Sequence, residues 1–228
     1  MLDALPRILL CLTALLTLDQ AGAAALQASV VDAQGKPLGE AVLTLSGGPA
    51  PTAPPGKAVM DQVNQQFLPH VLAVRSGTEV SFPNRDDIRH HVYSFSPAKR
   101  FELRLYHGTP TAPVLFDKPG LVVLGCNIHD WMVGYIYVTD DAWFGVADEA
   151  GKLSLDVPPG HYKATLWHPR NPDLLPVAAG ELEVPAGGLE KRFSLVPGSD
   201  PAPAGTPPPA RDDGGFGDAF RKATREAR

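Results

Sequence analysis

A short segment near the middle of the chain carries three side chains that bind soft metal ions. Cys126, His129 and Met132 follow the spacing C-x2-H-x2-M. A thiolate, two imidazoles and a weakly bound axial thioether make up a mononuclear blue-copper site, so this segment lacks only one imidazole. Simple core packing of the cysteine and methionine is the alternative. We favour metal ligation, because the polar residues Asn, His and Asp interrupt the segment where a core would place aliphatic side chains.

Two apolar runs must hold this segment in place. Leu121–Leu124 and Val133–Val138 are rich in β-branched and aromatic residues and predict two β-strands joined by the ligand-bearing loop. The second imidazole could come from His90 or His91, which open a further predicted strand upstream. Neighbouring strand residues point to opposite faces, so one ion is expected to take only one of the pair. Periodicity alone does not decide between them.

Composition excludes several classes of function. The 228 residues include 20 basic and 25 acidic side chains, for a net charge of -5, which is not the basic balance of a nucleic-acid-binding protein. The 24 Pro and 22 Gly suit short strands joined by many turns, and no long helical periodicity is present, so we expect an all-β fold. Hydrolase, zinc-protease and phosphate-loop motifs are absent, and we therefore do not expect an enzyme.

The N-terminal residues are typical of an export signal. Arg7 precedes an apolar run over residues 8–18, and small residues follow at 21–25. We expect export to the periplasm and no membrane association once the signal is cleaved, although an uncleaved anchor is the alternative. Cys11 leaves with the signal, so Cys126 has no disulfide partner in an oxidising compartment, and metal ligation would explain how its thiol is protected.

Residues 59–139 resemble a cupredoxin of the plastocyanin and amicyanin kind. The resemblance also extends to exported proteins called methylamine utilization proteins or plastocyanins. The motifs that carry it are Phe67-x-Pro69, Gly77-Thr-x-Val80-x-Phe82-x-Asn84, His90-x-Val92 and Cys126-x2-His129-x2-Met132-Val-Gly134. The resemblance implies a Greek-key sandwich holding one type 1 copper through His90, Cys126, His129 and Met132. His91 stands where many members have Asn, and it is expected, with Asn84, to brace the site or to serve as an alternative ligand.

The flanking segments resemble carboxypeptidase-regulatory-like β-sandwiches. Residues 28–45 read as strand, turn and strand, and residues 148–162 match the later strands of that family. Because these two parts lie on either side of the cupredoxin-like segment, we expect one discontinuous sandwich with the copper module inserted in a connection. The predicted organisation is a signal peptide (1–25), first sandwich strands (26–50), a cupredoxin domain (57–139), the remaining sandwich strands (140–197) and a disordered Pro-rich tail (198–228).

The resemblance implies a blue-copper protein that carries single electrons by outer-sphere transfer. We expect Ile128 and Trp131 to form an apolar patch for a redox partner, such as a cytochrome or a periplasmic dehydrogenase. Loop residues Asp86, Asp87 and Arg89 are expected to be solvated charges, with partner steering as the alternative. A periplasmic copper carrier or chaperone and a metal-free structural or binding β-sandwich protein are the competing functions.

Overall fold

Strands and turns make up nearly all of the fold. A computed structural model of the chain describes residues 24–49, 54–110 and 112–198, and the only helical element in these ranges is a short 3-10 turn at Pro172–Leu174. The all-β prediction is confirmed. Nearly all of the predicted signal peptide and Pro-rich tail lies outside the described residues. The exceptions are Gly198 and the start of the first strand at Ala24, whose side chain is buried opposite Val157.

Across the ranges that the structure describes, no helix is both long and apolar enough to cross a membrane.

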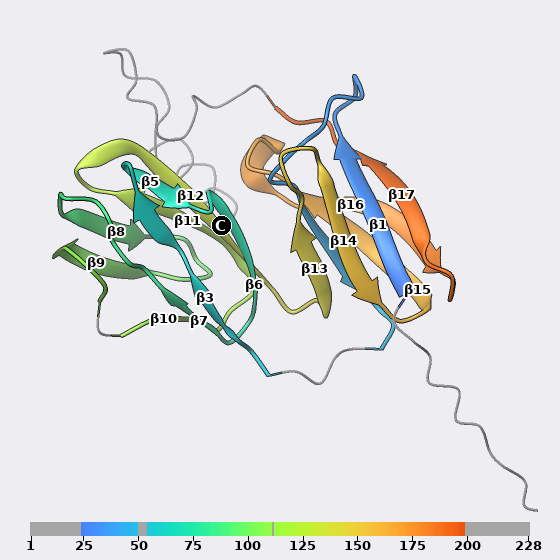
Figure 1. The fold of residues 1–228 in the computed structure, drawn as a ribbon, viewed down its shortest axis with the longest axis horizontal. Helices are drawn as coiled ribbons and strands as arrows, with labels where there is room; N and C mark the ends of the chain where they lie inside the picture. The colour runs from blue at the N-terminus through green and yellow to red at the C-terminus, as the bar shows by residue number, and fades with distance from the viewer. Residues whose placement is uncertain (1–23, 50–53, 111, 199–228) are drawn as a thin grey trace, which may run out of the picture.

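Ten strands between residues 57 and 139 form one sandwich, which we call the inserted sandwich (Figure 1). They are β3 (Lys57–Val59), β4 (Asp61–Val63), β5 (Gln66–Leu68), β6 (Val71–Arg75), β7 (Thr78–Ser81), β8 (His90–Ser94), β9 (Phe101–Tyr106), β10 (Val114–Phe116), β11 (Gly120–Cys126) and β12 (His129–Thr139). A three-stranded sheet of order β10-β7-β3 and a five-stranded sheet of order β6-β12-β11-β8-β9 enclose a core of aromatic and aliphatic side chains. The small ladder β4-β5 lies beside them.

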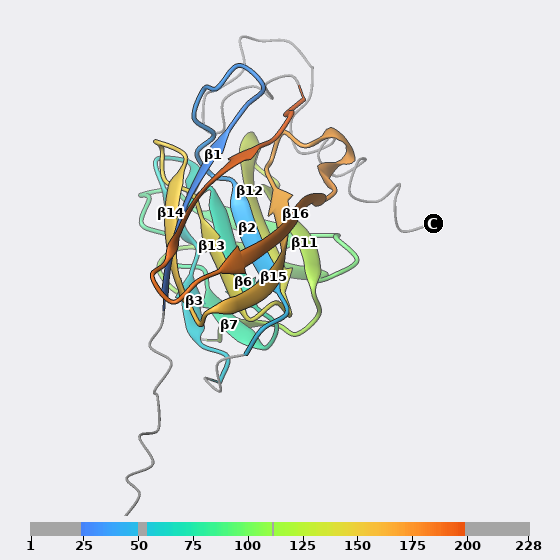
Figure 2. The ribbon, with the colours of Figure 1, turned by 90° about the vertical axis from the view of Figure 1, so that its right-hand side faces the viewer.

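Seven strands from the two ends of the described chain form a second sandwich, which we call the split sandwich (Figure 2). They are β1 (Ala24–Val31), β2 (Val42–Ser46), β13 (Trp143–Val146), β14 (Lys152–Val157), β15 (Gly160–Trp167), β16 (Val177–Val184) and β17 (Leu189–Ser194). The sheets have the orders β14-β1-β17 and β13-β2-β15-β16. Leu26 lies opposite Leu155, and Leu43 lies opposite Leu166, so segments far apart in the sequence share one core.

The strand, turn and strand predicted over residues 28–45 do not form a hairpin. The strands β1 and β2 exist, but they lie in opposite sheets and do not pair with each other. Burial explains the difference: β1 alternates between buried and accessible residues, whereas Val42–Leu45 of β2 are all buried. A strand that is covered on both faces reads as a continuous apolar run and belongs inside a sheet.

The two sandwiches meet through a third apolar cluster. Trp167 of the split sandwich is 1% exposed, and its ring centroid lies 5.6 Å from those of Tyr135 and Tyr137 on β12. Beside it, His70 Nδ1 lies 2.9 Å from Glu40 Oε1, joining the two sandwiches by an ion pair. Aromatic contacts of this kind contribute about 0.5–1.5 kcal/mol each beyond the burial of area. The outer face of β6 and β12 is therefore covered, whereas Glu102 and Arg104 on β9 remain exposed at the far edge of the sheet.

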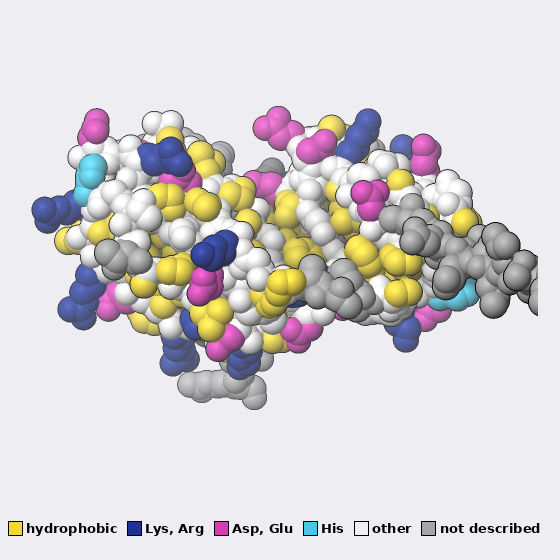
Figure 3. All heavy atoms as spheres, turned by 60° about the horizontal axis from the view of Figure 1, so that its bottom comes forward, with side chains coloured by type: hydrophobic (Ala, Val, Ile, Leu, Met, Phe, Trp, Pro, Cys, Tyr) yellow, Lys and Arg dark blue, Asp and Glu magenta, His cyan; other side chains and the backbone are white. Residues whose placement is uncertain are grey.

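Charged side chains of both signs are scattered over both parts of the molecule on the face drawn in Figure 3. This mixture agrees with the modest net charge of -5. On this face no surface of a single sign appears that would attract a polyanion.

Candidate metal centre

The candidate centre lies at the end of the β11–β12 hairpin. Cys126 is the last residue of β11 and His129 the first of β12, and these two residues pair across the turn with a register irregularity at Gly125 and Cys126. Strand β8 runs on the other side of β11, where Val92 lies opposite Cys126. The backbone N–H of Asn127 donates to the carbonyl of His91 at 3.2 Å, which ties the loop to β8.

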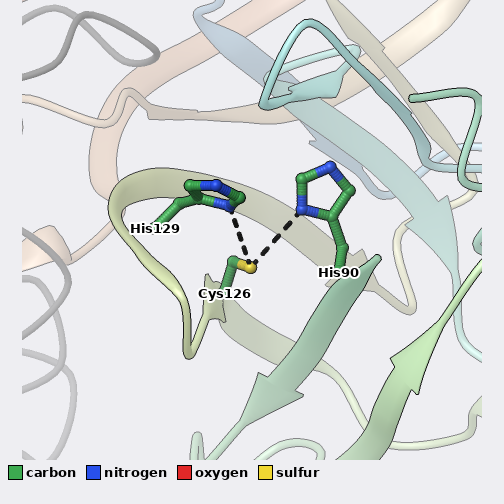
Figure 4. A group of neighbouring side chains, drawn as sticks. All are labelled: His90, Cys126 and His129. Carbon is green, nitrogen blue, oxygen red and sulfur yellow. Dashed lines mark hydrogen bonds between the residues drawn. The ribbon is translucent and has the colours of Figure 1, made fainter. Parts of the chain in front are cut away.

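Two imidazole rings point at one sulfur (Figure 4). The Nδ1 atoms of His90 and His129 each lie 3.7 Å from Cys126 Sγ, and the ring centroids are 5.0 Å apart. A divalent metal bound to sulfur at about 2.3 Å and to nitrogen at about 2.0 Å, with an angle of about 120° between the bonds, requires a sulfur–nitrogen separation of about 3.7 Å. Both observed sulfur–nitrogen separations therefore match those expected around one bound ion.

The structure separates the two adjacent histidines. His90 is fully buried and faces Cys126, whereas His91 turns to the other face of β8. There His91 Nε2 lies 2.9 Å from Glu102 Oε1 on β9, and the ring packs edge-on against Tyr93. Alternation along β8 thus places His90 at the centre and His91 in a pair with Glu102, which settles a choice that the sequence left open.

Met132 lies in the core of the inserted sandwich. Its side chain is 0% exposed and belongs to the same buried cluster as Cys126. Its thioether is therefore shielded from water within the same apolar core as the cysteine.

Asp86 differs from the solvated loop charge that its sequence context predicts. Its side chain is only 12% exposed, and its Oδ2 lies 2.7 Å from Nε2 of His90. The backbone N–H groups of Asn64 and Gln65 donate to its two carboxylate oxygens at 2.6 and 2.8 Å. The expectation of a solvated charge is therefore wrong for Asp86. The available signal was its position four residues before the histidine, in a loop that returns to the site.

Asn84 braces the loop that contains Asp86. Its Nδ2 donates to the carbonyls of Ile88 and Tyr106 at 2.8 and 3.0 Å, and its Oδ1 accepts from the N–H of Asp86 at 3.0 Å. All of these bonds are internal to the protein, so the side chain fixes the path of the loop between β7 and β8.

Electrostatics favour a charged sulfur and a charged ring before any metal binds. Burial alone would raise the pKa of Cys126, but the His90 ring and the backbone amides of His91 and Ile128 lower it overall. Burial alone would lower the pKa of His90, but Cys126 and Asp86 raise it overall. Burial and the neighbouring His90 lower the pKa of His129. These neighbours favour the thiolate form of Cys126, which is the form that binds metals.

Ile128 and Trp131 flank the centre on the accessible side. Ile128 at the tip of the turn is 46% exposed, and the Trp131 ring centroid lies 5.2 Å from that of His129. These residues form an apolar border next to the histidine ring that is less buried.

Comparisons with known proteins find cupredoxins over part of the chain. A purple cupredoxin from Nitrosopumilus maritimus is 22% identical, with a TM-score of 0.31, over 36% of this chain and 96% of its own. An amicyanin variant in the Cu(I) state is 20% identical, with a TM-score of 0.33, over 36% and 81%. A copper-containing nitrite reductase from Thermus scotoductus is 25% identical, with a TM-score of 0.34, over 49% and 28%. No protein-family model matches the sequence, and no curated protein matches it.

Proposed function

We propose that this protein is a type 1, or blue, copper protein that carries single electrons and is not an enzyme. The observation that carries the proposal is the approach of two Nδ1 atoms, from His90 and His129, to 3.7 Å from the sulfur of Cys126. A cysteine with two histidines in a trigonal arrangement and a weak thioether nearby is the ligand set of blue-copper electron-transfer sites.

Each ligand residue has a distinct role in the proposal. Cys126 and the two imidazoles would hold the ion, and the thioether of Met132 would bind weakly and tune its potential. A bound copper ion would supply a one-electron couple between Cu(II) and Cu(I). The strands on both sides of the ligands restrain the side chains, so the ligand positions change little between the two oxidation states. The burial of His90, Cys126 and Met132 favours a retained ion over one that is exchanged, which argues against a copper chaperone.

The cellular setting belongs to the same proposal. An export signal at residues 1–25 would bring the protein to the periplasm, where ligation would protect its single remaining thiol. Electrons would leave or enter at the partly exposed edge of the centre, between Ile128 and Trp131, toward a redox partner protein. A cytochrome or a periplasmic dehydrogenase would have the required chemistry.

Absorption spectroscopy tests the proposal directly. Adding one equivalent of Cu(II) to the mature protein should produce an intense visible thiolate-to-copper band, and Cys126→Ser should abolish it. His161→Ala, which changes an exposed histidine of the split sandwich, is the control and should leave the band intact. Stoichiometric copper binding without the band in the wild-type protein would exclude a blue-copper site and favour the chaperone alternative.

A further inference from the structure

We infer that Asp86 is a positioning residue that fixes the ring of His90 and, through its charge, favours the oxidised over the reduced metal. This inference rests on the proposed function. It concerns a carboxylate that would not touch the ion itself but would act through a ligand.

The contact between the two side chains determines which nitrogen of His90 faces the centre. Asp86 Oδ2 lies 2.7 Å from Nε2 of His90, so this nitrogen carries the proton and donates. In the neutral ring the other nitrogen, Nδ1, then presents its lone pair toward Cys126. A carboxylate or carbonyl partner on the outer nitrogen is the usual device that sets the orientation and raises the basicity of a metal-binding histidine.

Asp86 is itself held in place from an element distant in sequence. The amides of Asn64 and Gln65 donate to its carboxylate, and both residues have positive φ angles of 54° and 59° in the turn between β4 and β5. This turn conformation aims two successive N–H groups at one anion. The carboxylate is consequently fixed on the side remote from His90 as well.

The neighbouring loop charges do not cancel the negative charge of Asp86. Arg85 pairs with Asp61, and Asp87 and Arg89 are exposed. A mostly buried carboxylate interacts more strongly with nearby charges than a solvated one, because less water screens it. Cu(II) carries one more positive charge than Cu(I), so Asp86 stabilises the oxidised site more than the reduced site. The carboxylate should therefore lower the reduction potential.

Voltammetry of the copper-loaded full chain tests the effect of the charge. Asp86→Asn keeps the size of the side chain and removes its charge. We expect it to weaken Cu(II) binding relative to Cu(I) about tenfold, which corresponds to a rise in potential of about 59 mV for a one-electron couple. Asp87→Asn makes the same charge change one residue away at an exposed position and should shift the potential far less. Asp86→Glu should keep most of the wild-type potential.

Nitrogen NMR of the metal-free protein tests the positioning separately. In alkaline buffer His90 should hold its proton on Nε2 in the wild type and in Asp87→Asn, and should become a mixture of tautomers in Asp86→Ala. If Asp86→Ala does not fold, Asp86→Asn gives the same comparison with a weaker acceptor.

The possible results separate the two proposals. Two results would overturn the role of Asp86 in a protein that still shows the blue band. One is an equal reduction potential for Asp86→Asn and Asp87→Asn; the other is an unchanged His90 tautomer in Asp86→Ala and Asp86→Asn. A wild-type protein without the band would refute the blue-copper function, while the tautomer measurement would still decide whether Asp86 positions His90.

Discussion

Replacing His90 with alanine should remove the blue-copper site, whereas replacing the adjacent His91 should leave it intact. The two positions differ by one residue in sequence but face opposite sides of β8. His90→Ala deletes an imidazole 3.7 Å from Cys126 Sγ. His91→Ala deletes only an ion pair with Glu102 and a ring contact with Tyr93.

The expected magnitudes follow from these contacts. The partly exposed His91–Glu102 pair contributes about 0.2–1 kcal/mol and the ring contact about 0.5–1.5 kcal/mol, so His91→Ala should cost about 1–2 kcal/mol of unfolding free energy without metal. Replacing a residue that only hydrogen-bonds to a metal ligand weakens metal binding by up to roughly 100-fold. Loss of the ligand His90 itself should weaken binding by at least that factor. At a copper concentration of about 100 times the wild-type Kd, binding stabilises the wild type by about 2.7 kcal/mol, and a variant with 100-fold weaker binding by only about 0.4 kcal/mol.

Urea unfolding with and without copper, combined with the visible spectrum, measures both effects. Wild type and His91→Ala should gain nearly equal stability from copper and show the same band, and His90→Ala should gain little and show none. A blue His90→Ala protein, or a colourless but folded His91→Ala protein, would refute the assignment of the ligand.

Further predictions concern the interface, one glycine and pH. Trp167→Ala should lower the unfolding free energy by about 3–5 kcal/mol in urea titrations, because it empties the contact between the sandwiches; a loss below about 1 kcal/mol would contradict that packing. Gly134→Ala should cost about 1–3 kcal/mol, since a Cβ there would lie 2.8 Å from Cβ of Phe67, whereas Gly187→Ala meets no neighbour within 4 Å and should be nearly neutral by the same measurement. Copper affinity should fall as pH decreases through the raised pKa of His90, by up to tenfold per pH unit, because the ring must lose its proton to bind; isothermal titrations between pH 5 and 8, chosen as about the range of histidine titration, would expose a flat profile if this is wrong.

The ligand loop could be predicted because its chemistry is local. Cys126 and His129 lie within one short segment flanked by obvious strand sequences, so residue type and spacing were sufficient to bring them together. The choice between His90 and His91 was not local. It depends on the register of β8 against β11 and on the presence of Glu102 on the neighbouring strand β9. The alternation of residues along β8 alone carries neither piece of information.

Asp86 could not be assigned from the sequence for a related reason. A run of charged residues in a loop normally indicates solvent exposure, and this is correct for Asp87. Asp86 departs from the rule because the turn at Asn64 and Gln65, some twenty positions earlier, supplies amide donors that offset the cost of its burial. Only the packing of the β4–β5 turn against the loop reveals this.

The strands themselves were largely predictable, but their partners were not. The apolar runs Leu121–Leu124 and Val133–Val138, for example, lie within the observed bounds of β11 and β12. The apolar pattern of β2 instead reflects its burial, in part against the neighbouring sandwich. Residues 28–45 taken alone do not show which strand β2 pairs with. Tertiary contact between distant segments decides such cases.

The position of Trp167 over Tyr135 and Tyr137 would restrict the approach of a redox partner of the proposed kind. The outer face of β6 and β12 is already occupied by the split sandwich, so such a partner would approach at the tip of the hairpin, where Ile128 is exposed. Such an approach offers only a small footprint. Small footprints are characteristic of brief encounters between redox proteins, in which rapid departure matters as much as recognition.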